Sequence, residues 1–215
     1  MIKLFYNLGA CSLASHIALE EAGADYEAIR IDTRSGVQGR PEYLAINPKA
    51  RVPALVTERG VLTETPAILA WIAQAFPQAA LAPTDPWAFA QAQSFNSYLC
   101  STVHVAHAHR HRGYRWADEE SSFADMRRKV PETVGACFQL IEDEFLRGPW
   151  VLGEAYSICD AYLFTIADWL EDDGVDPRRF PKVFDHRERV RARPAVAKVL
   201  AEEAAAPFGE VAIGG

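Results

Sequence analysis

The chain has 215 residues, 49% of them hydrophobic, and carries a formal net charge of −7 at pH 7. This length allows two modest domains, and the negative charge argues against general nucleic-acid binding. No apolar run is long enough to span a membrane, and the N-terminus lacks the pattern of a secretory signal peptide. Four widely separated cysteines suit a reducing compartment, so we expect a cytoplasmic protein without nucleic-acid or membrane partners.

About the first 80 residues alternate between strand and helix patterns, which is typical of an α/β domain on one small sheet. Polar segments, prolines and Gly23 separate the elements. The predicted elements in chain order are strand Ile2–Tyr6, helix Ser12–Ala22, strand Tyr26–Ile31, helix Pro41–Ile46, strands Val52–Val56 and Gly60–Leu62, and helix Pro66–Phe76. We place this domain at residues 1–78.

A linker with three prolines, from Pro77 to Pro86, follows, and beyond it the strand pattern disappears. Apolar positions at helical spacing then predict an all-α domain at residues 86–215. The predicted helices are Trp87–Arg112, Ser121–Leu146, Ser157–Glu171, and two shorter ones between Arg179 and Ala204. The third is nearly all apolar, which predicts a buried central helix that begins with a Ser157–Asp160 capping box.

Cys11 falls at the first turn of a helix that follows a strand directly. Unpaired amides and the positive end of the helix dipole favour an anion there. A thiol in this place is biased toward the nucleophilic thiolate. A small buried cysteine that only packs is the alternative interpretation of a lone cysteine.

Two further pairs accompany Cys11. Proline is disfavoured within a sheet, so Val52-Pro53 allows two interpretations. A cis bond would free the Val52 backbone to pair with an extended peptide ligand. Alternatively, Pro53 lies on an edge strand. Glu64-Thr65 opens a helix, where a hydroxyl and amides could hold a carboxylate while Glu64 takes an ammonium group. Ordinary helix capping explains the second pair equally well.

Together these motifs resemble those of a cytosolic glutathione S-transferase. The segments Gly9–Gly23 and Tyr43–Lys49 are similar to the bacterial beta class, and the resemblance covers essentially the whole chain. It implies a thioredoxin-like N-terminal domain, an all-helical C-terminal domain, a cis Pro53 and a homodimer. In that family, the first domain of one subunit packs on the helical domain of the other.

The resemblance also implies roles for single residues. Cys11, Ser12, Tyr6 and His104 would be catalytic, and Cys11 would be able to form a mixed disulfide with glutathione. The implied glutathione-binding residues are Val52, Pro53, Glu64, Thr65 and Arg34. The predicted electrophile pocket comprises Leu8, Ala108, Arg112, Tyr114, Trp116 and Trp169, although the three aromatic residues could equally be part of the core. Glutathione is the co-substrate, and no metal is expected.

The sequence departs from the family pattern at three places. Arg34 stands in the loop where a lysine often contacts glutathione, Ser97 replaces an expected asparagine, and Val105 an expected lysine. On a regular helix Ser97, Ser101, His104, Ala108 and His111 share one face, opposite Phe95, Leu99 and Ala106. This predicts a polar face turned toward a cleft between the domains.

The histidine-rich end of this helix allows three interpretations. His104, His107 and His111 could meet one metal ion, although no cysteine or carboxylate lies nearby in the sequence. The arginines between them favour a positive field for an anionic co-substrate. A solvated basic helix end explains the same residues.

We therefore predict an enzyme, a glutathione S-transferase in which the thiolate of glutathione attacks a small electrophilic co-substrate in detoxification. Cys11 adds thiol–disulfide exchange or peroxide reduction as a second reaction. A non-catalytic glutathione-binding or scaffold protein on the same fold is the alternative, because of the three departures.

Overall fold

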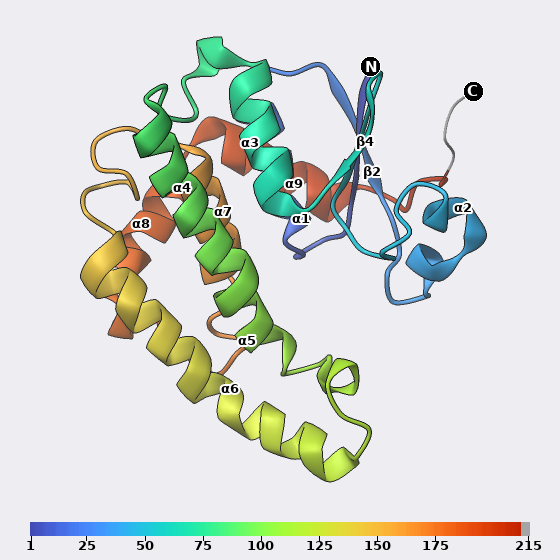
Figure 1. Ribbon diagram of the computed structural model, residues 1–215, viewed down its shortest axis with the longest axis vertical. Coiled ribbons are helices and arrows are strands. Elements are labelled where there is room, and N and C mark those ends of the chain that lie inside the picture. The colour runs from blue at the N-terminus through green and yellow to red at the C-terminus, as the bar shows by residue number, and fades with distance from the viewer. Residues whose placement is uncertain (212–215) are drawn as a thin grey trace. The chain divides into compact units, whose positions relative to one another are not determined.

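The computed structural model describes residues 1–211 and divides the chain into two compact units. The first comprises residues 1–82 together with the C-terminal segment from Arg191 onward. The second comprises Pro83–Val190. Both domain types that the sequence predicts are present, namely an α/β unit and an all-helical unit (Figure 1).

A four-stranded mixed sheet forms the centre of the first unit. Its strands are β1 (Ile2–Tyr6), β2 (Tyr26–Arg30), β3 (Ala54–Thr57) and β4 (Gly60–Thr63), in the order β2-β1-β3-β4. β1 pairs in parallel with β2, whereas β3 runs antiparallel to both β1 and β4. The register places Leu4 opposite Ala28 on one side and Leu55 on the other.

Helices cover the two faces of this sheet. On one side α1 (Ser12–Glu21) packs against α3 (Thr65–Ala75) and α9 (Pro194–Ala205). On the other side lies the short helix α2 (Pro41–Leu44), as Figure 1 shows. Its Tyr43 is buried against Phe5 in a cluster that also contains Ile29 and Ala54. Alternating residues of the strands thus supply both halves of the core.

Buried and half-buried ion pairs join α9 to α1. Nδ1 of His16 lies 2.9 Å from Oε1 of Glu203, and both side chains are almost fully buried. Arg193 binds Glu21 through two nitrogens, and Lys198 binds Glu20. The sequence-based second domain extended from residue 86 to the end of the chain, whereas these contacts group the last helix with the first unit.

The helical unit begins with α4 (Pro86–Tyr98) and α5 (His104–Ala108), which a π turn at Leu99–Val103 connects. It continues with α6 (Glu120–Leu140) and a second π turn (Ile141–Phe145), then α7 (Ile158–Ala167) and α8 (Pro181–Arg191). Short 3₁₀ turns lie at Val37–Gly39 and Pro77–Ala79 in the first unit, and at Gly113–Arg115 and Pro177–Arg179 in the second.

Helix α7 is buried along its whole length, which confirms the predicted central helix. The predicted capping box is also present, because the Ser157 amide donates to Asp160 at 2.7 Å and the Ser157 hydroxyl accepts from the Cys159 amide. Asp160 additionally accepts from the Val151 amide and lies 2.9 Å from Nε2 of the buried His186. The start of α7 is therefore a fully buried polar network.

None of the helices in the described part of the chain combines the length and apolarity that a membrane crossing requires.

Candidate functional site

Cys11 is half-buried and occupies the N-cap position of α1, as the sequence predicts. The Asn7–Ala10 turn, closed by the Ala10 amide on the Asn7 carbonyl at 3.2 Å, connects β1 to this helix. The Sγ atom of Cys11 lies 3.5 Å from the carbonyl oxygen of Val52, 41 positions away in the sequence. The structure thus brings together the thiol and the backbone segment that the sequence singled out.

Ser12 is the first residue of α1, as the sequence predicts, and its side chain contacts the preceding turn. Its side chain is buried, and its hydroxyl accepts from the Asn7 amide at 3.2 Å and donates to the Asn7 carbonyl at 3.3 Å. These two bonds fix the turn that carries Cys11. The predicted catalytic role of Ser12 stays a prediction.

Tyr6, the last residue of β1, is buried in the first unit. Its side chain is 1% exposed and its ring centroid lies 5.2 Å from that of His16, on the α1 side of the sheet. Burial, and next the Glu203 carboxylate, raise the pKa of Tyr6 to about 12. The Tyr6 phenol therefore packs in the core of the first unit, and its predicted catalytic role stays a prediction.

Buried side chains hold the segment that precedes β3. The Val52–Pro53 peptide bond is cis. The carbonyl oxygen of the preceding Arg51 accepts from the Tyr43 hydroxyl at 2.8 Å and from Nδ2 of Asn47 at 2.7 Å. Burial raises the pKa of Tyr43, so its hydroxyl remains a donor. Sequence reasoning saw Tyr43 and Asn47 only as part of a short helix and its end, and missed this anchoring role.

Glu64 has a strained backbone (φ 74°) that residues other than glycine rarely adopt, and its side chain is 55% exposed. Nζ of Lys49 lies 2.5 Å from Oε1 of Glu64 and 2.6 Å from Oγ1 of Thr63. Thr65 is buried as the first residue of α3. The structure therefore adds Lys49, which the sequence analysis did not select, to the predicted Glu64-Thr65 pair.

Arg34 and Leu8 lie in loops of the first unit. Arg34 is exposed, and its main-chain amide donates to Asp32 in the loop after β2. Leu8 is 45% exposed in the turn between β1 and α1. Their predicted contacts with glutathione and with a co-substrate stay predictions.

Three rings gather in the helical unit at the end of α5. The Trp169 ring lies 4.3 Å from His107 in a stacked arrangement and 5.0 Å from His104, centroid to centroid. Nε2 of His104 lies 3.4 Å from a guanidinium nitrogen of Arg112. The structure thus brings together His104, Arg112 and Trp169 from the predicted set.

The same region contains an aspartate–histidine pair that sequence reasoning missed. Nδ1 of His107 lies 2.9 Å from both carboxylate oxygens of Asp173. The Asp173 side chain is 2% exposed, and Arg110 approaches it to 3.9 Å. A carboxylate 66 positions away leaves no local signal in the sequence.

The remaining predicted pocket residues separate into two groups. Tyr114 and Trp116 are exposed, and the Trp116 ring lies 4.4 Å from that of His109. Ala108 is buried, whereas Ala106 is only half-buried, so the predicted assignment of these two positions to helix faces is wrong. The π turn explains the difference, because its wider turn rotates the following residues relative to a regular helix.

The described His, Cys, Asp and Glu side chains near the end of α5 are not arranged as a metal site. Within residues 1–211, no three His, Cys, Asp or Glu side chains group in a way that could hold a metal ion. Burial, and next the neighbouring Arg110 and Arg112 guanidinium groups, hold the pKa of His111 below its ordinary value. Burial is the largest cause of this shift, so the positive field that the sequence suggested stays a prediction.

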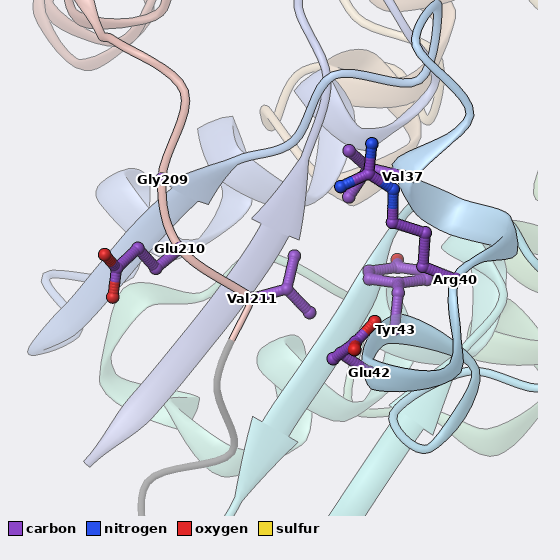
Figure 2. A pocket seen from close by; sticks show the side chains of 7 residues that line it. All are labelled: Val37, Arg40, Glu42, Tyr43, Gly209, Glu210 and Val211. Carbon is purple, nitrogen blue, oxygen red and sulfur yellow. The ribbon is translucent and has the colours of Figure 1, made fainter.

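A separate open groove of about 380 Å³ lies in the first unit between the 37–43 segment and the C-terminal segment. Figure 2 shows Val211 pointing toward the Tyr43 side of this groove, whereas Glu210 points away. Val211 also packs against the core cluster around Phe5 and Ile29. The C-terminal segment thus forms one wall of this groove.

Family comparisons match both halves of the chain. Residues 1–74 match the glutathione S-transferase N-terminal domain family, and residues 108–203 match the glutathione S-transferase C-terminal domain family. Glutathione S-transferase GstA of Escherichia coli O157:H7 is 30% identical over 205 residues, which cover 94% of this chain and 98% of GstA. The disulfide-bond oxidoreductase YfcG of Escherichia coli K12 is 30% identical over 195 residues, covering 85% of this chain and 86% of YfcG.

A solved structure shows the same fold over nearly the whole length. The crystal structure of a glutathione transferase homologue from Sulfitobacter, with bound glutathione, superimposes with a TM-score of 0.92. It is 49% identical, and the match covers 94% of this chain and 98% of that one.

Proposed function

The chain belongs to the glutathione S-transferase family, and on that premise we propose that it binds glutathione on its first unit and transfers the glutathionyl thiolate to a small electrophile. One observation carries the proposal, namely the 3.5 Å approach of the Cys11 sulfur to the Val52 carbonyl oxygen. A thiol at the N-cap of a helix and an adjacent stretch of backbone are what an extended thiol peptide needs for recognition.

The binding mode follows from the same elements. The Val52 backbone next to Pro53 pairs with the cysteinyl part of the tripeptide, which places the ligand sulfur beside Cys11. Glu64 takes the ammonium group of the γ-glutamyl end, and the Thr65 end of α3 takes its carboxylate. The Lys49–Glu64 contact supports this arrangement, because it holds the Glu64 carboxylate at the surface.

Thiol–disulfide exchange through Cys11 is a second reaction of the same site. Cys11 is half-buried, so its sulfur can be reached by a disulfide co-substrate. The similarity to a relative named as a disulfide-bond oxidoreductase supports this candidate. In this reaction the Cys11 thiolate attacks one sulfur of the disulfide, the sulfur–sulfur bond breaks and the other half leaves as a thiol. A glutathione thiolate then attacks the retained half, which breaks its bond to Cys11, forms a mixed disulfide with glutathione and frees Cys11.

Calorimetric titration with glutathione, followed by assays with a panel of electrophiles and disulfides, tests the proposal. We expect saturable binding at or below millimolar glutathione and glutathione-dependent turnover of at least one co-substrate. Binding without any turnover would favour a scaffold protein on the same fold, and absence of binding would contradict the proposal.

We further propose a cytoplasmic homodimer that detoxifies electrophiles, as the family resemblance implies. The support is the match of both family domains along the chain. Sedimentation equilibrium at micromolar concentration tests the assembly, and a monomer there would contradict it.

A further inference from the structure

Beyond α9 the chain continues as a short segment attached to the end of β2. The Gly209 amide donates to the Arg30 carbonyl at 2.7 Å, and Nη1 of Arg30 donates to the Ala206 carbonyl at 2.8 Å. The Arg30 guanidinium also lies 4.8 Å from the centroid of the Phe208 ring. Both the main chain and the side chain of one arginine therefore fix residues 206–211, here called the strap.

Gly209 lets the strap approach the sheet closely. A Cβ atom at this position would lie 2.8 Å from Cγ2 of Ile29. Ile29 is 7% exposed and belongs to the core cluster around Phe5, so its side chain has little room to shift. A larger residue at position 209 would therefore displace the strap from β2.

Val211 covers the same side of the core as Tyr43. Its side chain packs against the cluster that contains Phe5, Ile29 and Tyr43. In Figure 2 it points toward the Tyr43 side of the groove that the strap and the 37–43 segment line together. The apolar contact of Val211 therefore helps to hold the cluster, and with it the Tyr43 ring, in place.

Tyr43 connects this cluster to the main chain of the candidate binding edge. Its ring lies edge-on to that of Phe5, with the centroids 5.9 Å apart. Its hydroxyl donates to the Arg51 carbonyl at 2.8 Å. The next residue along the chain is Val52, whose side chain packs against the same cluster. A displacement of the Tyr43 ring would therefore reach the Val52 backbone through one hydrogen bond and one peptide unit.

We propose that Gly209 and Val211 are positioning residues for glutathione, because they hold the strap on the cluster from which Tyr43 fixes the main chain before Val52. This inference rests on the proposed function, which assigns the Val52 backbone to the cysteinyl part of the tripeptide. The strap needs no contact with the ligand. It raises the affinity because the free protein keeps its binding edge in the conformation that binds.

Two variants displace the strap in different ways. Gly209→Ala adds the Cβ atom that would meet Ile29, and Val211→Asp places a charge against the apolar cluster. We expect each to raise the Kd for glutathione about fivefold in calorimetric titration. The kcat at saturating glutathione should stay within about twofold of wild type, because the strap acts on binding and not on the chemical step. Glu210→Ala, the matched control, changes a side chain that points away from the groove and should keep the wild-type Kd.

A double-mutant cycle tests the route through Tyr43. In Tyr43→Phe, which lacks the hydrogen bond to the Arg51 carbonyl, Val211→Asp should raise the Kd for glutathione by less than about twofold. An effect of Val211→Asp that is as large in this background as in wild type would overturn the inference.

Hydrogen exchange supplies a measurement without glutathione. The amides of Tyr43 and Leu44, which donate to the Arg40 carbonyl, should exchange faster in Val211→Asp than in wild type. The amides of α1 should keep their wild-type rates, which separates a local effect from general destabilisation. Unchanged exchange at Tyr43 and Leu44 would overturn the inference.

The titrations also separate this inference from the proposed function. Binding in wild type with an unchanged Kd in both Gly209→Ala and Val211→Asp overturns this inference alone. A wild-type protein that does not bind glutathione contradicts the proposed function and this inference with it.

Discussion

The sulfur of Cys11 and the main-chain carbonyl of Val52 approach each other at the start of α1. Along the chain, α1, β2, a 3₁₀ turn and α2 lie between the two residues. Their contact links the predicted nucleophile to the predicted peptide-binding edge, and the first prediction follows from it.

Cys11→Ala should abolish glutathione-dependent reduction of a disulfide such as hydroxyethyl disulfide. Conjugation of an aryl chloride should stay within about tenfold of wild type, because glutathione brings its own thiol to the helix end. Steady-state assays of both reactions on one preparation measure this. Loss of both activities to the same extent would show that Cys11 is needed for conjugation as well.

Glu64→Gln should weaken glutathione binding without unfolding the protein. Loss of a charge-assisted hydrogen bond predicts an affinity about tenfold lower. The Lys49–Glu64 pair is half-exposed, so the free energy of unfolding should change by less than about 1 kcal/mol. Calorimetry and urea unfolding give the two quantities, and Lys49→Met serves as a control for the stability effect. Unchanged glutathione affinity would remove Glu64 from the site.

Asn47→Ala should reduce both stability and glutathione affinity. The Asn47 side chain donates to the Arg51 carbonyl and accepts from the Lys49 amide, and it is 1% exposed. Loss of both bonds should cost about 2 kcal/mol of unfolding free energy. Tyr43→Phe removes one bond to the same carbonyl and should cost about 1 kcal/mol. Equal glutathione affinities in wild type and Asn47→Ala would show that the hydrogen bond to the Arg51 carbonyl does not position the Val52 backbone for binding.

Glu203 predicts a pH-dependent contribution to stability. Burial raises the pKa of Glu203 in spite of its hydrogen bond from His16. The folded state therefore binds this proton more tightly than the unfolded state does, and the resulting stabilisation is complete below the ordinary value of 4.5. It is lost as the pH rises through the folded-state pKa.

Glu203→Gln removes that titration and keeps an acceptor for His16. The unfolding free energy of wild type minus that of Glu203→Gln should therefore decrease as the pH rises from about 4.5, as urea unfolding at several pH values would measure. Glu203→Leu leaves the buried His16 without its acceptor and should cost about 3 kcal/mol at pH 7. A difference between wild type and Glu203→Gln that does not vary with pH would contradict the raised pKa.

Local patterns predicted most of the fold. Each strand and each α-helix that we expected is present, and β1, α1 and α7 start within one residue of their predicted positions. Caps and breakers account for this accuracy, because Gly23 and the Ser157–Asp160 capping box act through neighbouring residues. The π turn at Leu99–Val103 has no such local signal, and it displaced Ala108 from its expected face.

The candidate site was predicted less completely. Cys11, Val52 and Glu64 could be selected as candidate site residues from their positions at predicted element boundaries. The burial of Tyr6 and Ser12 could not be predicted in this way, because it depends on the packing of α1 against the sheet. Lys49 and Asp173 acquire their roles through partners that are 15 and 66 positions away. Pairing over such separations is a property of the assembled unit and leaves no periodic trace in the sequence.

The grouping of α9 with the first unit has a consequence for biosynthesis. A ribosome releases the strands and α1 early, but Glu203, the acceptor of His16, emerges only after the whole helical unit. Until then His16 lacks its buried acceptor and one side of α1 lacks its cover. The thiol-bearing unit is thus begun first and completed last, so its maturation during translation waits for nearly the entire polypeptide.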